Sequence, residues 1–122
     1  MNTVKIEMPY IGKNLSVNSY RLSGRKGTTY SIKSSVKGWM VDLDSKARKF
    51  KGKLLNYPLV ITVNGKFKDR ASEPDLDNLS KVICDTLKVS LAVDDRHFRY
   101  RAGKVEYGFT SPILEIEIRE EG

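Results

Sequence analysis

The chain has 122 residues, of which 39% are hydrophobic and 30% are charged, and it carries a formal net charge of +7. This length and composition predict a single folded domain over residues 1–122. They exclude a membrane span, because no apolar run approaches the ~20 residues that a transmembrane helix needs. The single cysteine, Cys84, excludes an internal disulfide, and the sequence opens without a basic-then-apolar leader, so we expect a cytoplasmic protein.

Charge is divided unevenly along the sequence. Residues 1–70 contain 15 Lys and Arg against 4 Asp and Glu, whereas residues 71–122 contain 7 against 11. A basic first half suits a polyanion such as nucleic acid, and a carboxylate-rich second half suits a cation. Solubility alone is the alternative explanation of the basic residues.

The first half of the sequence predicts a strand, a basic loop and a helix. Residues 3–9 alternate apolar and charged side chains, as in a strand with one buried face. Residues 10–28 mix Gly and Asn with basic residues and predict a long loop, followed by a short extended segment over residues 28–33. Apolar residues at helical spacing then predict a helix over residues 35–50, with Trp39 in the core or at a subunit interface. The candidate phosphate contacts in the loop are Arg21, Arg25 and Lys26.

The second half predicts more strands and a second helix. Residues 57–67 form a strand candidate that the Asn64-Gly65 dipeptide interrupts with a hairpin or a bulge. Residues 96–107 and 113–118 are strand candidates at the end of the chain. The sequence therefore predicts an α+β fold, in which a mixed sheet is packed by two main helices over about residues 35–50 and 76–88.

The second helix opens on the stretch Asp75-Leu76-Asp77-Asn78-Leu79-Ser80-Lys81. Asp and Asn cap the free amides of a first helical turn, and the helix dipole favours negative charge there. Capping explains one acid. It does not explain two acids one residue apart, a lysine one turn later and the second acidic pair Asp94-Asp95.

Clustered carboxylates repel one another unless a cation lies between them. Mg²⁺ takes one or two carboxylates, keeps several waters and accepts a phosphate oxygen. For Asp95 to reach Asp75 and Asp77, residues 89–94 must run back along the helix. The alternation of Val89, Leu91 and Val93 predicts a buried extended segment of that kind.

The pattern D-L-D-N-L-x-K, then D-x-L, then D-D resembles the RusA family of Holliday junction resolvases. The residues that carry the resemblance are Asp75, Leu76, Asp77, Asn78, Leu79, Lys81, Asp85, Leu87, Asp94 and Asp95. This resemblance implies a small Mg²⁺-dependent endonuclease, with Mn²⁺ as a substitute ion. It also implies a homodimer that acts on four-way DNA junctions in recombination and repair, in a bacterium or a phage.

The resemblance also implies roles for individual residues. The metal ligands would be Asp75, Asp77 and Asp95, with Lys81 as the catalytic lysine. Residues expected to support the ligands are Asn78, Asp85 and Asp94, although a simple surface pair with Lys81 explains Asp85 equally well. Candidate DNA contacts beyond the basic loop are Lys68, Arg70, Arg99 and Arg101. The place two residues after the last acid, where the family commonly has glutamine, holds His97.

Three alternatives remain open from the sequence. One is a nuclease with the same metal chemistry that cuts other branched or duplex DNA. Another is a DNA-binding module without activity, whose acids only cap helices. The last is a protein-interaction domain with incidental basic charge. Cys84 is interpreted as a buried, inert thiol rather than as a nucleophile.

Overall fold

The computed structural model describes residues 3–16, 21–22, 31–32 and 34–121. Its centre is a four-stranded mixed sheet in the order β1-β6-β4-β5. The bounds are β1 (Thr3–Pro9), β4 (Leu59–Lys66), β5 (Phe98–Glu106) and β6 (Ile113–Glu120). β6 pairs antiparallel with both β1 and β4, whereas β4 and β5 are parallel. The predicted α+β fold is confirmed.

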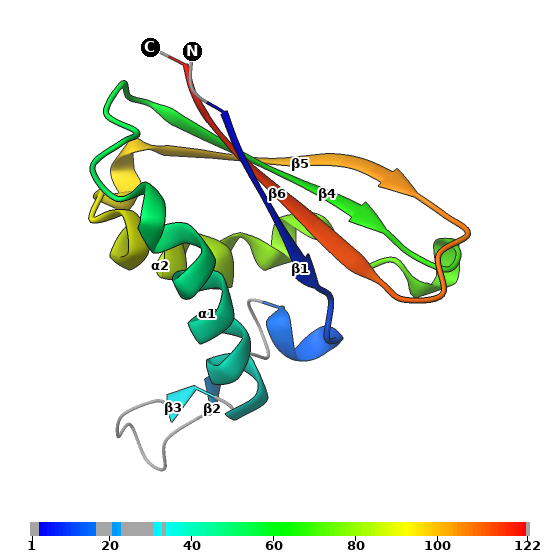
Figure 1. Cartoon of the computed structure of the whole chain (residues 1–122). Coiled ribbons are helices and arrows are strands. Elements are labelled where there is room, and N and C mark those ends of the chain that lie inside the picture. Colours follow the sequence, from blue (N-terminus) through cyan, green and yellow to red (C-terminus); the bar gives the residue numbers. More distant parts are fainter. Residues whose placement is uncertain (1–2, 17–20, 23–30, 33, 122) are drawn as a thin grey trace.

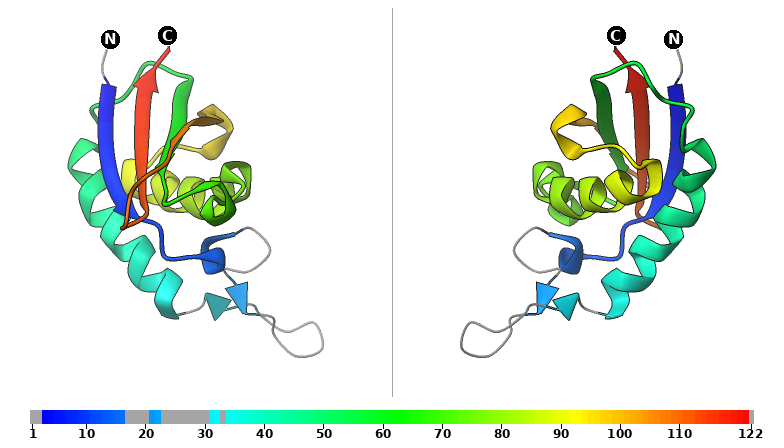
Figure 2. Two further views of the ribbon diagram at one scale, coloured as in Figure 1. Left: turned by 90° about the vertical axis from the view of Figure 1, so that its right-hand side faces the viewer. Right: turned by 90° about the vertical axis from the view of Figure 1, so that its left-hand side faces the viewer.

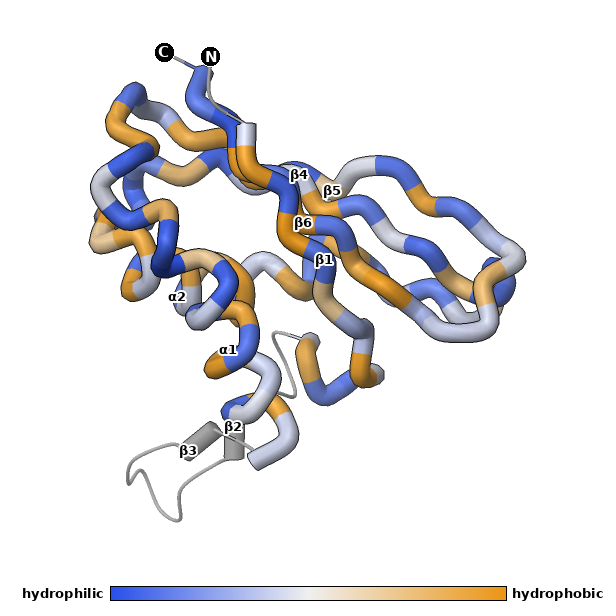
Figure 3. Tube along the Cα trace, viewed as in Figure 1, coloured by the Kyte–Doolittle hydropathy of each residue, from blue (hydrophilic) through white to orange (hydrophobic). Residues whose placement is uncertain are grey.

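One face of the sheet carries the hydrophobic core. Along β1, the apolar residues Val4, Ile6 and Met8 are buried and the residues between them are exposed, as the alternation predicts. Figure 3 shows the same alternation of hydropathy along β1 and β6. The helices α1 (Ser34–Ala47) and α2 (Ser80–Leu91) pack against the sheet (Figures 1 and 2). Their apolar residues join this core.

Helix α1 also covers the outer edge of β1. Trp39 donates its indole N–H to the Pro9 carbonyl at 2.7 Å, and Lys46, two turns later, donates to the Glu7 carbonyl at 2.8 Å. An edge strand with uncovered carbonyls invites pairing with other chains, so these bonds protect it. Trp39 is only 3% exposed, which assigns it to the core rather than to a subunit interface. A 3₁₀ turn, η3 (Arg48–Phe50), completes the helical stretch predicted over residues 35–50.

The connection from β4 to β5 contains α2, and its C-terminal end differs from the prediction. Residues 89–91 are helical, and Val89 is 69% exposed, so the predicted extended return over residues 89–94 is wrong. The helix ends at Ala92, which adopts the left-handed conformation (φ 54°). The N–H groups of Ala92 and Val93 bond to carbonyls of the last turn, at 3.3 and 3.2 Å. The chain therefore reverses sharply at one residue.

Strand β4 continues through Asn64 and Gly65 instead of stopping there. The dipeptide produces a bulge in the pairing with β5, which is one of the two predicted outcomes. Asn64 Oδ1 accepts the Lys104 N–H across this bulge at 2.8 Å. A Cβ on Gly103 would lie 2.0 Å from that oxygen, so the contact requires glycine at this position.

The predicted basic loop is described only in part. Residues Lys13–Leu15 form a 3₁₀ turn, η1, and β2 (Arg21–Leu22) pairs antiparallel with β3 (Ser31–Ile32). Arg25 and Lys26 lie outside the described residues, and so does the side chain of Arg21. None of the helices in the described part of the chain combines the length and apolar character that a membrane crossing requires.

The bond between Trp39 and Pro9 provides a test of the α1–β1 packing. We expect Trp39→Phe to lower the free energy of unfolding by about 1–3 kcal/mol, because the Pro9 carbonyl loses a part-buried donor and the smaller ring leaves a gap. Lys46→Met is the matched control. This substitution removes the second bond from α1 to β1, but at an exposed site where water replaces the donor. The free energy of unfolding should therefore change by no more than about 0.5 kcal/mol. Urea denaturation measures both free energies of unfolding. Equal losses in the two variants would contradict the conclusion that the Trp39 bond is the more important of the two.

Candidate active site

The first acidic turn is η5 (Leu76–Leu79), which leads directly into α2. Asp75 Oδ1 accepts the Asp77 N–H at 3.0 Å, and the Asp75 carbonyl accepts the Asn78 N–H at 3.0 Å. Leu76 and Leu79 are buried and anchor the turn, whereas Asp75 and Asp77 are exposed. The predicted capping is therefore confirmed for Asp75, and Asp77 is presented to solvent.

The second acidic turn, η6 (Asp95–His97), has the same construction. Asp94 Oδ1 accepts the Arg96 N–H at 3.0 Å, and this bond is the main reason that the pKa of Asp94 is lowered. Asp95 is exposed, and its Oδ2 lies 3.9 Å from Lys88 Nζ. In both turns one acid caps the backbone and a following acid is exposed. His97 stacks on the Tyr57 ring, with centroids 4.5 Å apart.

Lys81 is the second residue of α2, four positions after Asp77, and is exposed. Its Nζ is 3.3 Å from Asp85 Oδ1, and about half of its side chain is exposed. The expected pair between Lys81 and Asp85 is thus present, while the supporting role of Asp85 and the catalytic role of Lys81 stay predictions. Lys81 is the more exposed partner, at 49% against 16% for Asp85, so its ammonium group stays accessible from solvent within this pair.

Tyr100 and Cys84 lie between the two acidic turns. Burial raises the pKa of Tyr100, and the charges of Cys84, Asp77 and Asp75 raise it further. Burial likewise raises the pKa of Cys84 to about 12, with Asp85 and Asp95 as additional causes and Lys81 opposing them. Asp75 and Asp77 are therefore close enough to act on Tyr100, and Asp95 is close enough to act on Cys84.

The acids of the predicted ligand set thus form two groups along α2. Within the described residues, no three His, Cys, Asp or Glu side chains converge closely enough to hold a metal ion by themselves. The donors are carboxylate oxygens, which Mg²⁺ prefers, and Mg²⁺ takes only one or two of them beside water and phosphate. The Asp75–Asp77 turn offers two such groups, so its donor set fits Mg²⁺ or Mn²⁺ and is unsuited to zinc.

Tyr100 is the residue that sequence reasoning missed. Its hydroxyl donates to the Leu76 carbonyl at 2.5 Å and so joins β5 to the first acidic turn. The sequence shows only a strand in which rings alternate with arginines. The bond joins residues 24 positions apart, and periodicity carries no signal for it.

The predicted DNA-contact residues lie around β5. Arg99 and Arg101 alternate with Tyr100 and are exposed, so they project from the face of the sheet opposite the acidic turns. Lys68 and Arg70 are exposed in the segment between β4 and η5, where Arg70 begins the 3₁₀ turn η4 (Arg70–Ser72). Basic side chains are thus present along β5 and in the segment that follows the end of β4.

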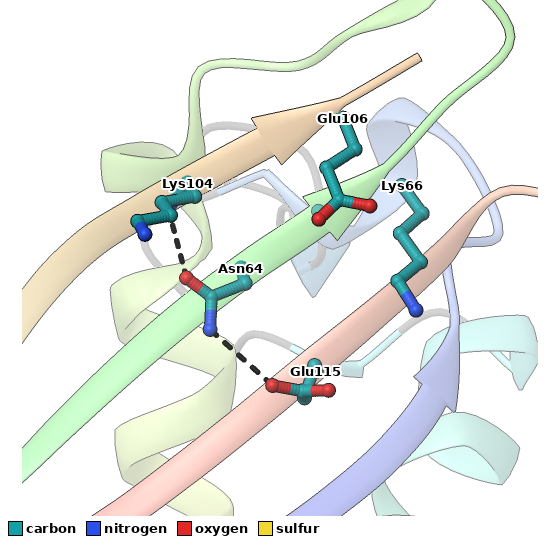
Figure 4. Close-up of a pocket in the computed structure, with 6 residues that line it drawn as sticks. Asn64, Lys66, Lys104, Glu106 and Glu115 are labelled. Atoms are coloured by element: carbon teal, nitrogen blue, oxygen red, sulfur yellow. Dashed lines mark hydrogen bonds between the residues drawn. The ribbon is translucent and has the colours of Figure 1, made fainter. Parts of the chain in front are cut away.

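A separate pocket lies on the helix-free face of the sheet, and Figure 4 shows its lining. Asn64 donates to Glu115 at 3.5 Å and accepts from the Lys104 backbone. Two carboxylates, Glu106 and Glu115, are balanced there by Lys66 and Lys104. Such a balanced set attracts neither a polyanion nor a divalent cation strongly, so this pocket is a poor candidate for the chemistry.

Comparison with known proteins identifies the family. The family model described as Endodeoxyribonuclease RusA matches residues 16–119, which is most of the chain. The chain belongs to the RusA family. The match covers both acidic turns, Lys81 and Tyr100, and the family's description supports a nuclease. No curated protein shows significant similarity to the chain.

Cys84 in this RusA-family protein offers a test of the packing between the acidic turns. With a pKa of about 12 against the ordinary 9.0, its thiolate fraction at pH 8 falls by roughly three orders of magnitude. We expect iodoacetamide to alkylate the native protein correspondingly slowly at pH 8. The urea-unfolded protein should react at the ordinary rate. Equal rates in the two states would show that the packing around the half-buried Cys84 does not protect its thiol.

Proposed function

We propose that this protein is a Mg²⁺-dependent, structure-selective endonuclease that cleaves four-way DNA junctions in recombination and repair. The observation that carries the proposal is the paired construction of the acidic turns. Asp75 and Asp94 cap the backbone, while Asp77 and Asp95 are exposed beside a helix that presents Lys81. Membership of the RusA family supports this choice over a structural role for the acids.

The protein's own residues have separate tasks in the proposed reaction. Asp75, Asp77 and Asp95 hold one or two ions, and Asn78 and Asp94 maintain the turns that present them. When bound, Mg²⁺ supplies polarisation of the scissile phosphate and a lower pKa for the attacking water. Lys81 places its ammonium group near the phosphate and stabilises the charge that develops there. Its partner Asp85 keeps the lysine close to the turn until DNA arrives.

We also propose that the active protein is a homodimer in a bacterial or phage-infected cytoplasm. A four-way junction is resolved by two symmetric cuts, which two copies of one site supply. A groove between α1 and α2 supports this proposal, because it is bordered by Val41 and Val89, which are 61% and 69% exposed. Lys37 and Asp44 also line this groove, so two antiparallel copies of α1 would bring opposite charges together.

Metal and substrate dependence test the proposal directly. We expect cleavage of a synthetic four-way junction with Mg²⁺ or Mn²⁺, and none with excess chelator or with Ca²⁺, which is larger and takes looser geometry. The measurement is a cleavage assay on the junction beside linear duplex and flap DNA of the same sequence. Robust cleavage in chelator would contradict the metal-dependent mechanism. Equal cleavage of all three DNAs would show that the substrate class is broader than four-way junctions.

Asp77→Asn separates catalysis from DNA binding. The neutral amide keeps the shape of the side chain but is a poor metal ligand, so we expect single-turnover cleavage to fall by several orders of magnitude. Junction binding in chelator should stay equal or become tighter, because one negative charge facing the phosphates is gone. Lys81→Ala should lose cleavage and also some affinity, because it removes a positive charge.

Asp69→Asn is the matched control for this series. Asp69 is exposed and caps the neighbouring turn η4 through Ser72, but it belongs to neither acidic turn. Its replacement should leave cleavage unchanged. Normal cleavage by Asp77→Asn would show that the acids only cap helices and take no part in catalysis. Loss of junction binding by a folded Asp77→Asn protein would assign that residue to the DNA surface.

A further inference from the structure

The peptide unit between Leu76 and Asp77 is held at both ends. Its N–H group bonds to Asp75 Oδ1 at 3.0 Å, and its carbonyl accepts the Tyr100 hydroxyl at 2.5 Å. A peptide unit is planar, so bonds at its opposite ends fix its rotation about the neighbouring single bonds. That rotation sets the direction in which the Asp77 side chain leaves the backbone.

The two bonds that hold the Leu76–Asp77 peptide unit, from Asp75 and from Tyr100, are called the clamp. Tyr100 is well suited to be one end of this clamp. It is half-buried in β5, and its position opposite Ile61 directs the ring to the core face of the sheet. The Tyr100 hydroxyl is protonated at neutral pH, as in an ordinary tyrosine, so it serves as the donor to the Leu76 carbonyl. The other end of the clamp, Asp75, is itself one of the proposed metal ligands.

The same strand connects this clamp to the second acidic turn. β5 begins immediately after η6, so only four residues separate Asp95 from Tyr100. The bond from Tyr100 to the first turn therefore ties the turn that carries Asp77 to the strand that directly follows the turn of Asp95. Both acids are exposed, so packing does not hold their side chains, and the backbone of each turn sets where they lie.

We infer that Tyr100 is a positioning residue of the metal site, which orients Asp77 by holding the Leu76 carbonyl and sets its position relative to Asp95. This inference rests on the proposed Mg²⁺-dependent function. Tyr100 does not touch the metal or the DNA in this role. It acts through the backbone of the turn, and its loss changes the geometry of the carboxylates rather than their number.

Tyr100→Phe tests the inference, because it keeps the ring and removes only the hydroxyl. The matched control is Tyr107→Phe. Tyr107 also donates through its hydroxyl at 2.5 Å, but to the exposed side chain of Glu73 and not to the backbone of the acidic turn. Circular dichroism establishes that each variant is folded. Electron paramagnetic resonance of added Mn²⁺ then measures metal affinity of the protein without DNA.

We expect Tyr100→Phe to weaken Mn²⁺ binding by about 10- to 100-fold, as is typical when a group that orients a ligand is removed. Tyr107→Phe should bind Mn²⁺ like the parent protein. Both variants should bind a four-way junction in chelator with unchanged affinity. Unchanged Mn²⁺ affinity in Tyr100→Phe would overturn the inference and leave the proposed function standing, whereas absence of Mn²⁺ binding in the parent protein would overturn both.

A second measurement does not depend on the stability of Tyr100→Phe. With 3-fluorotyrosine at position 100, the ¹⁹F resonance should shift on titration with Mg²⁺ and saturate, because the clamped turn responds to the ion. The same label at position 107 should show a much smaller shift. Equal shifts at the two positions, or none at position 100, would contradict the positioning role.

Discussion

The parallel pairing of β4 with β5 is the constraint on which the proposed site depends. Parallel neighbours cannot be joined by a tight turn, so the chain must cross over between them. The crossover, residues 67–97, contains both acidic turns, α2 and Lys81. Tyr100 Oη lies 2.5 Å from the Leu76 carbonyl, and Asp95 lies beside Lys88, so α2 runs back along β5. All residues of the proposed site, apart from Tyr100, therefore belong to the single crossover connection between β4 and β5.

Local patterns predicted much of this fold. The alternation along β1 and the helical spacing in residues 34–50 are set by contacts between near neighbours and the core, and both elements were predicted almost to the residue. Residues 89–91 were assigned wrongly, because Val89, Leu91 and Val93 fit a strand as well as the end of a helix. The left-handed conformation of Ala92 decides between the two, and alanine gives no signal for it.

The candidate site was predicted in its residues but not in its arrangement. The acids and the lysine are visible because their spacing exceeds what capping explains. The sequence does not tell which acids cap the turns and which are exposed. The backbone geometry shows that Asp75 and Asp94 are the caps, whereas Asp77 and Asp95 are exposed. The two interpretations of the motif, capping and metal binding, are therefore compatible, because Asp75 caps its turn through Oδ1 and Asp94 caps the other turn, while Asp77 and Asp95 are exposed. One strong polar contact, from Tyr100 to Leu76, depends on sheet register and has no local signature.

The edge position of β5 explains how acidic and basic groups can serve one ligand. Residues 101–104 are exposed on both faces of the sheet, and Arg99 and Arg101 project from the face opposite Tyr100. Charged residues on an edge strand also prevent unwanted pairing with other strands, which is sufficient reason for their presence. In the proposed complex, a DNA backbone that follows this edge would meet arginines on one face of the sheet and the acidic turns on the other. Because carboxylates alone would repel the phosphates, we propose that bound metal and Lys81 supply the positive charge on the acidic side.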